Sequence, residues 1–207
     1  MDPLQASIWL SEPRFGAFLS SVAHDHERAV ALYEWHADMS SALFAAIRVF
    51  EVLLRNAIDR ILGAGQPQAP LHQTWLFDLA VLQPIAVKQV VVAVERLGRR
   101  EPTRSGVVAM LPFGFWASLF GRRYDPLWQT ALHRSFPHTN GTREECGAAM
   151  REIHVVRNRI AHHDSLLDHD VGQVFTTMQS VAAWIDPVAA RWLRRVARVE
   201  EVAARRP

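Results

Sequence analysis

Cysteine and long apolar runs are both scarce in this sequence of 207 residues. Cys146 is the only cysteine, so no disulfide can form within the chain. The first residues lack the charged start and apolar run of a signal peptide. No stretch approaches the roughly 20 uninterrupted apolar residues that a membrane-spanning helix requires. These absences predict a cytoplasmic protein without a membrane segment.

Lysine is also nearly absent, since Lys88 is the only one and the other basic residues are arginines. The formal net charge of +2 is too small to indicate a nucleic-acid-binding protein by itself. Residues 191–207 are more basic, and their arginines are Arg191, Arg194, Arg195, Arg198, Arg205 and Arg206. Such a run either holds an RNA backbone, which suits the planar guanidinium, or forms a solvated helix face. The second interpretation is the more frequent one.

Strand patterns are nearly absent, whereas apolar residues recur at intervals of three and four in segment after segment. The pattern therefore predicts an all-α protein. A hydrophobic content of 49% is sufficient for a full core, and we expect one domain over residues 1–207. The expected helices cover residues 25–36, 39–62, 85–97 and 142–161. Two further helices are expected to start at the Asp-Pro pairs 125–126 and 186–187, where the aspartate is placed as the cap before a proline at the first helical position.

Several residues mark where these helices begin and end. Asp25 is placed to cap the first helix, and Thr142 with Glu145 forms a capping-box pattern. We expect residues 63–67 to end the second helix and Gly98 to end the third. The β-branched residues 90–92 leave a strand as the alternative to a helix over 85–97.

The helix over residues 142–161 carries the residues of greatest chemical interest. Arg157 lies at the edge of its apolar face, and His154, Asn158 and His162 follow one another at i, i+4 beside that edge. Arg157 and His162 are five residues apart, which is about 140° around an ideal helix. They converge only if the helix frays or the long arginine reaches around it.

These side chains suit RNA cleavage, in which a 2′-hydroxyl attacks the adjacent phosphate and a cyclic phosphate results. Histidine as a residue type can take up and give back a proton near neutral pH, and His162 is placed to do so here. Arg157 remains charged, binds two oxygens at once and stabilises the extra negative charge on phosphorus. Asn158 can hold a phosphate oxygen or orient the histidine ring, and His163 can do the same or replace His162. This chemistry needs no metal ion and no cofactor.

Two other interpretations of the segment remain open. A helix carboxyl terminus favours His and Arg for their charge alone, because they face the negative end of the helix dipole. The segment also offers a local set of metal ligands, namely His162, His163, Asp164, Asp168, His169 and Asp170. No cysteine pair or His-Glu-x-x-His pattern accompanies that set, so a solvated loop explains it more simply and we predict no metal site.

The arrangement Arg157, Asn158, three residues, His162 resembles the R-x(4–6)-H motif of the HEPN ribonuclease superfamily, in which a polar residue follows the arginine. Other segments resemble its Abi-like (abortive infection, AbiD/AbiF-type) family, and they occur in the expected order. They are YEWH at 33–36, FEVLLRNAI at 50–58, FGFWASLF at 113–120, LW at 127–128, FP at 136–137 and VRNRIAHH at 156–163. The resemblance covers about residues 30–165.

This resemblance implies a HEPN-like helical bundle with additional helices and a metal-independent endoribonuclease that acts as a toxin or phage-defence effector. Arg157 and His162 would be catalytic, with Asn158 and His163 in support. Glu51, Arg55 and Asn56 would form a second layer facing the same cleft; from the sequence alone, Glu51 and Arg55 are a favourable i, i+4 surface pair. Because one motif occurs per chain, we expect a homodimer, with RNA as substrate and an antitoxin or regulatory RNA as a further partner.

Two alternative functions come from different classes. A non-catalytic RNA-binding or partner-binding helical domain predicts salt-sensitive RNA binding without product. A metal-dependent hydrolase built on residues 162–170 predicts sensitivity to chelators. The aromatic block 113–120 we interpret as core, in preference to a surface on which bases stack.

Overall fold

The computed structural model describes residues 3–66, 68–98 and 101–207, and within them every regular element is helical. The prediction of an all-α protein is therefore confirmed, and the alternative strand over 85–97 is wrong. The α-helices are α1 (Pro3–Leu10), α2 (Glu12–Ser21), α3 (His26–Leu62), α4 (Pro84–Leu97), α5 (Arg104–Met110), α6 (Phe113–Ser118), α7 (Asp125–Thr130), α8 (Arg143–Ala161), α9 (Val171–Ile185), α10 (Pro187–Val196) and α11 (Val199–Ala203). Short 3₁₀ turns are η1 (Leu71–Gln73), η2 (Trp75–Phe77), η3 (Arg122–Tyr124) and η4 (Leu132–Ser135).

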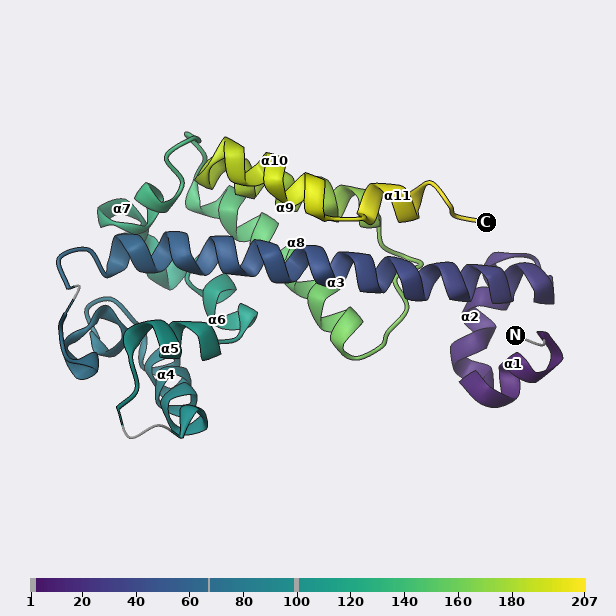
Figure 1. The fold of residues 1–207 in the computed structure, drawn as a ribbon, viewed down its shortest axis with the longest axis horizontal. Coiled ribbons are helices and arrows are strands. Elements are labelled where there is room, and N and C mark those ends of the chain that lie inside the picture. Colours follow the sequence, from purple (N-terminus) through teal and green to yellow (C-terminus); the bar gives the residue numbers. More distant parts are fainter. Residues whose placement is uncertain (1–2, 67, 99–100) are drawn as a thin grey trace.

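Helix α3, of 37 residues, runs along the longest axis of the molecule (Figure 1). Asp25 caps it as expected, accepting a hydrogen bond from the Arg28 backbone N–H at 3.0 Å, and Gly63 ends it. The two helices expected over 25–36 and 39–62 are one, because no glycine or proline interrupts the chain between residues 26 and 62. Separating them was wrong.

The other helices pack along α3. In Figure 1, α9, α10 and α11 lie along one side, α4, α5 and α6 lie below its carboxyl-terminal half, and α1 and α2 lie below its start. One hydrophobic cluster extends from Met39 to Val202, and a smaller one joins α1 and α2 to the first turns of α3. Although α3 is long, charged residues interrupt it, and among the described residues no helix has both the length and the apolarity to cross a membrane.

The expected helix caps are confirmed at three further places and wrong at a fourth. Thr142 and Glu145 form a complete capping box at α8, Gly98 ends α4 with φ of 57°, and Asp186 accepts from the Val188 N–H to cap α10. Asp125 is not a cap, because it is already helical and its carboxylate binds Arg143 of α8 instead.

The aromatic block 113–120 belongs to the core, as interpreted from the sequence. Phe113, Phe115, Trp116 and Phe120 are all buried, and Phe115 packs edge-on against Trp116. A buried ring has no free face on which a base can stack, so this block contributes stability rather than RNA contact.

Candidate functional site

Helix α8 ends in a turn that positions the last residues of the motif. The N–H of His163 bonds to the Ile160 carbonyl at 3.1 Å, and the N–H of Asp164 bonds to the Arg159 carbonyl at 2.8 Å. These two bonds define a Schellman motif, in which the residue after the cap is normally glycine because its backbone is left-handed. Here that residue is His163, with φ of 58°. The motif therefore places a histidine in a strained, left-handed backbone conformation.

The loop after α8 is held by side chains from three helices. Arg14 of α2 donates from Nη1 to the His163 carbonyl at 2.6 Å, and Arg159 donates from Nε to the Ser165 carbonyl at 3.0 Å. The Leu166 N–H donates to Nε2 of His36 on α3, also at 3.0 Å. Burial, helped by the charge of Arg14, lowers the pKa of His36, which keeps the ring neutral and able to accept.

Arg157 and two polar residues form a hydrogen-bonded chain on α8. Arg157 is half-buried and donates from Nη1 to Oδ1 of Asn158 at 3.3 Å. The Nδ2 of Asn158 lies 3.0 Å from Nε2 of His154. The strip of polar residues expected along α8 is therefore present, but the histidine that it connects to Arg157 is His154, for which we expected no role from the sequence.

Two residues of α3 complete this group, which we call the Arg157 cluster: Glu51, Arg55, His154, Arg157 and Asn158. Burial raises the pKa of Glu51, while the charges of Arg157 and Arg55 oppose that rise. Arg55 donates from Nη1 to the Ala109 carbonyl at 3.3 Å, and its buried Nε has no hydrogen-bond partner. The charges of Arg157 and Arg55 thus both act on Glu51, while the shared cleft that the family resemblance implies for these residues stays a prediction.

The remaining predicted site residues lie outside the cluster. His162 is exposed, and its backbone N–H continues the helical pattern by bonding to the Asn158 carbonyl at 3.0 Å. Because α8 is helical through Ala161, Arg157 and His162 point about 140° apart. Asn56 is exposed and lies about 140° around α3 from Glu51 by the same spacing. Within one chain, then, Arg157 is clustered with His154 rather than with His162.

A groove of about 900 Å³ opens between α2, α3 and the end of α8. We call it the α8 groove. Arg14, His36 and His163 supply its basic groups, and Phe44 supplies exposed aromatic surface, whereas the lining residue Phe18 is buried.

Arg157 lies just beyond one end of the α8 groove. Ile160 and Ala161 line the groove and follow Arg157 by three and four residues, so all three share one side of α8. On α3, Glu51 follows the groove residue Phe44 by seven residues and lies on the same face. The Arg157 cluster is thus the continuation of the groove along both helices.

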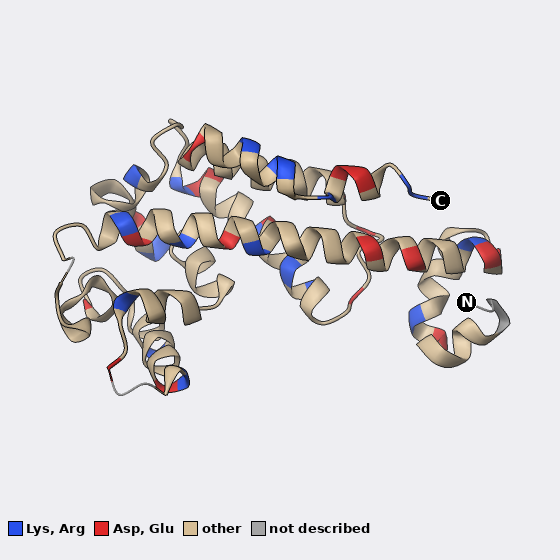
Figure 2. Cartoon of the chain, in the orientation of Figure 1, with Lys and Arg blue, Asp and Glu red and all other residues tan. Residues whose placement is uncertain are grey.

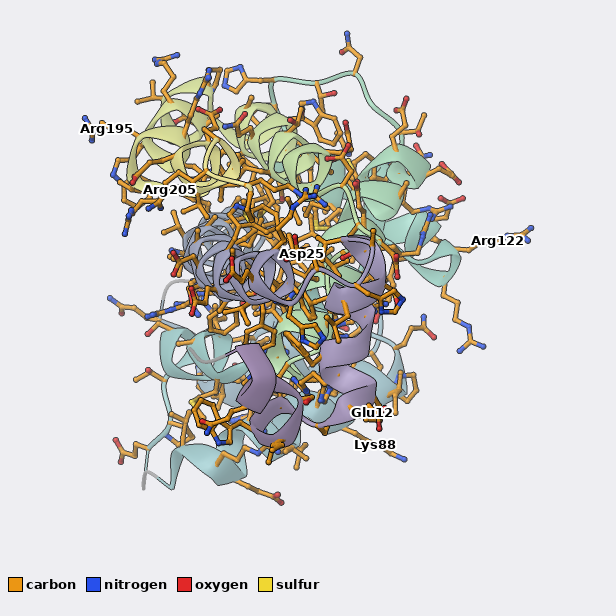
Figure 3. All side chains as sticks on the ribbon, turned by 90° about the vertical axis from the view of Figure 1, so that its right-hand side faces the viewer. Glu12, Asp25, Lys88, Arg122, Arg195 and Arg205 are labelled. Atoms are coloured by element: carbon orange, nitrogen blue, oxygen red, sulfur yellow. The ribbon has the colours of Figure 1, made fainter. Side chains whose placement is uncertain are left out.

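The carboxyl-terminal arginines are largely engaged with neighbouring residues. Arg194 pairs with Glu200 at 3.0 Å and Arg198 with Glu201 at 3.1 Å, and Figure 2 shows the basic residues of α10 next to the acidic residues of α11. Arg195, by contrast, extends into solvent (Figure 3). The expected solvated helix face therefore describes this segment better than a basic RNA-binding tail.

No metal centre emerges from the potential ligands after α8. Throughout residues 3–66, 68–98 and 101–207, no three His, Cys, Asp or Glu side chains come together closely enough to hold an ion. Asp170 is instead the N-cap of α9, accepting from the Gln173 N–H at 2.9 Å. The aspartate thus has a structural use.

Comparison of the chain with protein-family models, with curated proteins and with solved structures found no match in any of the three. The α8 groove and the Arg157 cluster, together with the motif resemblance, are therefore the features from which a function can be proposed.

Proposed function

We propose that the protein is a metal-independent endoribonuclease of the Abi-like family in the HEPN superfamily, with the corresponding helical bundle. The main observation in its support is the position of Arg157, which is half-buried, acts together with Arg55 on the charge of Glu51, and lies three residues before Ile160 on a helix that lines the α8 groove. A guanidinium in such a place is partly shielded from water, so its attraction for a phosphate is stronger than on an open surface.

In the proposed reaction, Arg157 binds the non-bridging oxygens of the scissile phosphate and stabilises the charge that develops on them. His162 takes the proton of the attacking 2′-hydroxyl or returns one to the leaving 5′-oxygen. Asn158 accepts a hydrogen bond from the Arg157 guanidinium, Glu51 acts on it only through its charge, and His163 supports the turn that carries His162. A 2′,3′-cyclic phosphate is the product.

The α8 groove is the proposed path of the RNA strand toward Arg157. Phe44, which is 38% exposed, offers an apolar surface for a base, and Arg14 offers a charge for a phosphate. Stacking combined with backbone charge is how proteins hold single-stranded nucleic acid. This path also explains why strain is tolerated at His163, which lies on the groove wall.

A second copy of the chain completes the proposed site. Arg157 and His162 point about 140° apart on a regular helix, so one chain cannot easily direct both at one phosphate. In a homodimer with the two α8 ends facing each other, Arg157 of one copy meets His162 of the other. An antitoxin or regulatory RNA that covered this face would silence the enzyme.

The direct test is incubation of purified protein with RNA, in the presence of a chelator, followed by mass analysis of the fragment ends. Wild-type protein is expected to give cyclic-phosphate ends, and Arg157→Ala and His162→Ala to reduce the rate at least 100-fold. Arg151→Ala is the matched control, since Arg151 is exposed on the same helix outside the cluster. Undiminished cleavage by the first two variants would contradict the proposal.

The divergence of Arg157 and His162 also favours the alternative of a non-catalytic RNA-binding helical domain. That function uses Arg157 and Arg14 to bind phosphate and makes no demand on His162. It predicts salt-dependent RNA retention with intact RNA recovered afterwards. The same mass analysis separates the two functions.

A further inference from the structure

His154 is fixed in place at the point where α8 meets α6. Its ring packs against Phe113 with the centroids 5.7 Å apart. A Cβ at Gly114 would lie 3.2 Å from its Cε1 and Nε2 atoms, so only glycine leaves the ring its present room. A half-buried imidazole that a neighbouring backbone accommodates so closely has one orientation, and its Nε2 atom therefore has a fixed partner.

The polarity of the hydrogen-bonded chain is determined from its arginine end. Arg157 can only donate, so the Asn158 atom facing it is the amide oxygen, as observed at 3.3 Å. The amide nitrogen of Asn158 must then face His154, and it too can only donate. Nε2 of His154 is consequently the acceptor, which requires a neutral ring with its proton on Nδ1.

The charged groups around His154 favour the same neutral form. Arg157 of its own helix acts on the charge of His154, and Arg157 and Arg55 act in turn on Glu51 of α3, while the neighbours of the ring from α6 are Phe113 and Gly114. Burial and the charge of Arg157 lower the pKa of His154. If the ring were protonated, its Nε2–H would face the Asn158 amide nitrogen, and both groups are donors. If the amide then flipped, the same nitrogen would face Arg157, which is also a donor.

We infer that neutral His154 is a positioning residue, which orients the Arg157 guanidinium through Asn158 and releases it when the ring is protonated. The functional part of this inference depends on the proposed ribonuclease activity, in which Arg157 binds the scissile phosphate. The structural part, the direction of the hydrogen bonds, stands without it.

The structural part is tested by nitrogen NMR of the histidine rings in the full chain. Wild-type protein is expected to show a His154 ring with unprotonated Nε2 from pH 8 down through the pH range in which an ordinary histidine becomes protonated. Asn158→Asp replaces the donor by a carboxylate, so the pKa of His154 should rise by at least one pH unit. A protonated Nε2 in the wild type at pH 7, or no change in Asn158→Asp, would overturn the inference.

The functional part is tested by the pH dependence of kcat/KM for RNA cleavage. His154→Gln keeps an acceptor near Nε2 and should retain activity within about threefold, with less loss at acid pH than the wild type. His154→Leu removes the acceptor and should lose at least tenfold in kcat/KM at pH 7. Equal activity of the Leu and Gln variants, both folded by circular dichroism, would overturn the positioning role.

The two parts fail separately. If the wild type cleaves no RNA, the proposed function is lost, while the NMR result still decides whether His154 orients Asn158. If RNA is cleaved and Arg157→Ala abolishes cleavage, the His154 variants alone decide the inference.

Discussion

At the scale of single residues, His163 combines a strained backbone with a place on the groove wall. A non-glycine residue in the left-handed region costs roughly 1 kcal/mol, and glycine avoids that cost. The contact that Arg14 makes here is to the backbone carbonyl, so it survives any substitution of the side chain. Because glycine would adopt this backbone conformation without strain, the presence of histidine indicates a use for its imidazole ring.

We therefore predict that His163→Gly stabilises the protein by about 1 kcal/mol and raises Tm by about 2–4 °C. Ala148→Gly, at an exposed helical position of α8, should instead lower Tm by a similar amount. Thermal unfolding followed by circular dichroism measures both. A lower Tm for His163→Gly would mean that the imidazole makes a stabilising contact, and a fall in RNA cleavage with a higher Tm would support its role in the site.

Cys146 gives a prediction for alkaline pH. Burial, with the nearby charge of Glu145, raises the pKa of its thiol to about 12. In the unfolded chain the thiol ionises near pH 8.5, so above that pH unfolding releases a proton. The free energy of unfolding should then fall by up to about 1.4 kcal/mol per pH unit between pH 8.5 and 12.

This slope is isolated by comparison with Cys146→Ala, which lacks the ionisable group. Urea titrations at pH 8, 9 and 10 should show the difference in free energy of unfolding between the two proteins narrowing as pH rises. Parallel curves would mean that the folded thiol ionises normally. In native protein at pH 8 the buried thiol should also resist alkylation.

Part of the site could be predicted from the sequence, and part of it could not. The helical spacing of His154, Asn158 and Arg157 was enough to expect their shared strip, because neighbours along one helix are fixed by its period. The selection of His154 over His162 depends on Phe113 and Gly114, and the anchoring of the turn depends on Arg14, 149 residues away from His163. Spacing along the chain contains no information about such distant contacts.

At the scale of elements, α8 depends on its first turn. The side chain of Thr142 accepts a hydrogen bond from the Glu145 N–H, and the side chain of Glu145 accepts one from the Thr142 N–H. This capping box starts the helix whose other end carries the motif. Next to that turn, the buried Arg143 donates to the Phe120 carbonyl at 2.7 Å and binds both Asp125 and Glu144. The start of α8 is thus anchored to α7 and to the segment after α6.

We predict that Thr142→Ala lowers the stability by about 1 kcal/mol, because one helix-start N–H loses its acceptor. Thr176→Ala on α9 is the matched control, since its hydroxyl only bonds back to the Gly172 carbonyl and its loss should change stability by under about 0.5 kcal/mol. Chemical denaturation measures both differences. Equal effects would show that the capping box contributes nothing specific.

Element boundaries followed the sequence wherever a capping side chain or glycine marked them, as at Asp25, Thr142, Asp186 and Gly98. Helix α7 does begin at Asp125, but the capping role expected of Asp125 is wrong for a long-range reason, because its carboxylate binds Arg143. The division of α3 failed for a local reason, since a weaker apolar pattern around Ala37 and Asp38 does not end a helix that lacks a breaker. A cap depends on residues that are neighbours in the sequence, so the sequence predicts it. Competition between residues far apart in the sequence cannot be predicted in this way.

For the molecule as a whole, the proposed reaction requires that Arg157 and His162, which point in different directions, act on one phosphate. Arg157 lies on the groove side of α8, and His162 lies at its exposed end. If each reaction centre combines Arg157 of one copy with His162 of another, neither of the single variants Arg157→Ala and His162→Ala has an intact centre alone. A mixed dimer, however, contains one centre with both wild-type residues and one with neither.

We therefore predict that mixing the inactive Arg157→Ala and His162→Ala proteins restores RNA cleavage. Random exchange makes half of the dimers mixed, each with one intact centre of two, so the expected recovery is about one quarter of the wild-type rate. Mixing Arg157→Ala with the double variant is the control and should remain inactive, because no combination then has an intact centre. Sedimentation confirms that dimers form and exchange. If the mixed protein stays inactive although dimers exchange, Arg157 and His162 must act within one chain, and α8 must unwind at Ala161 to bring them together.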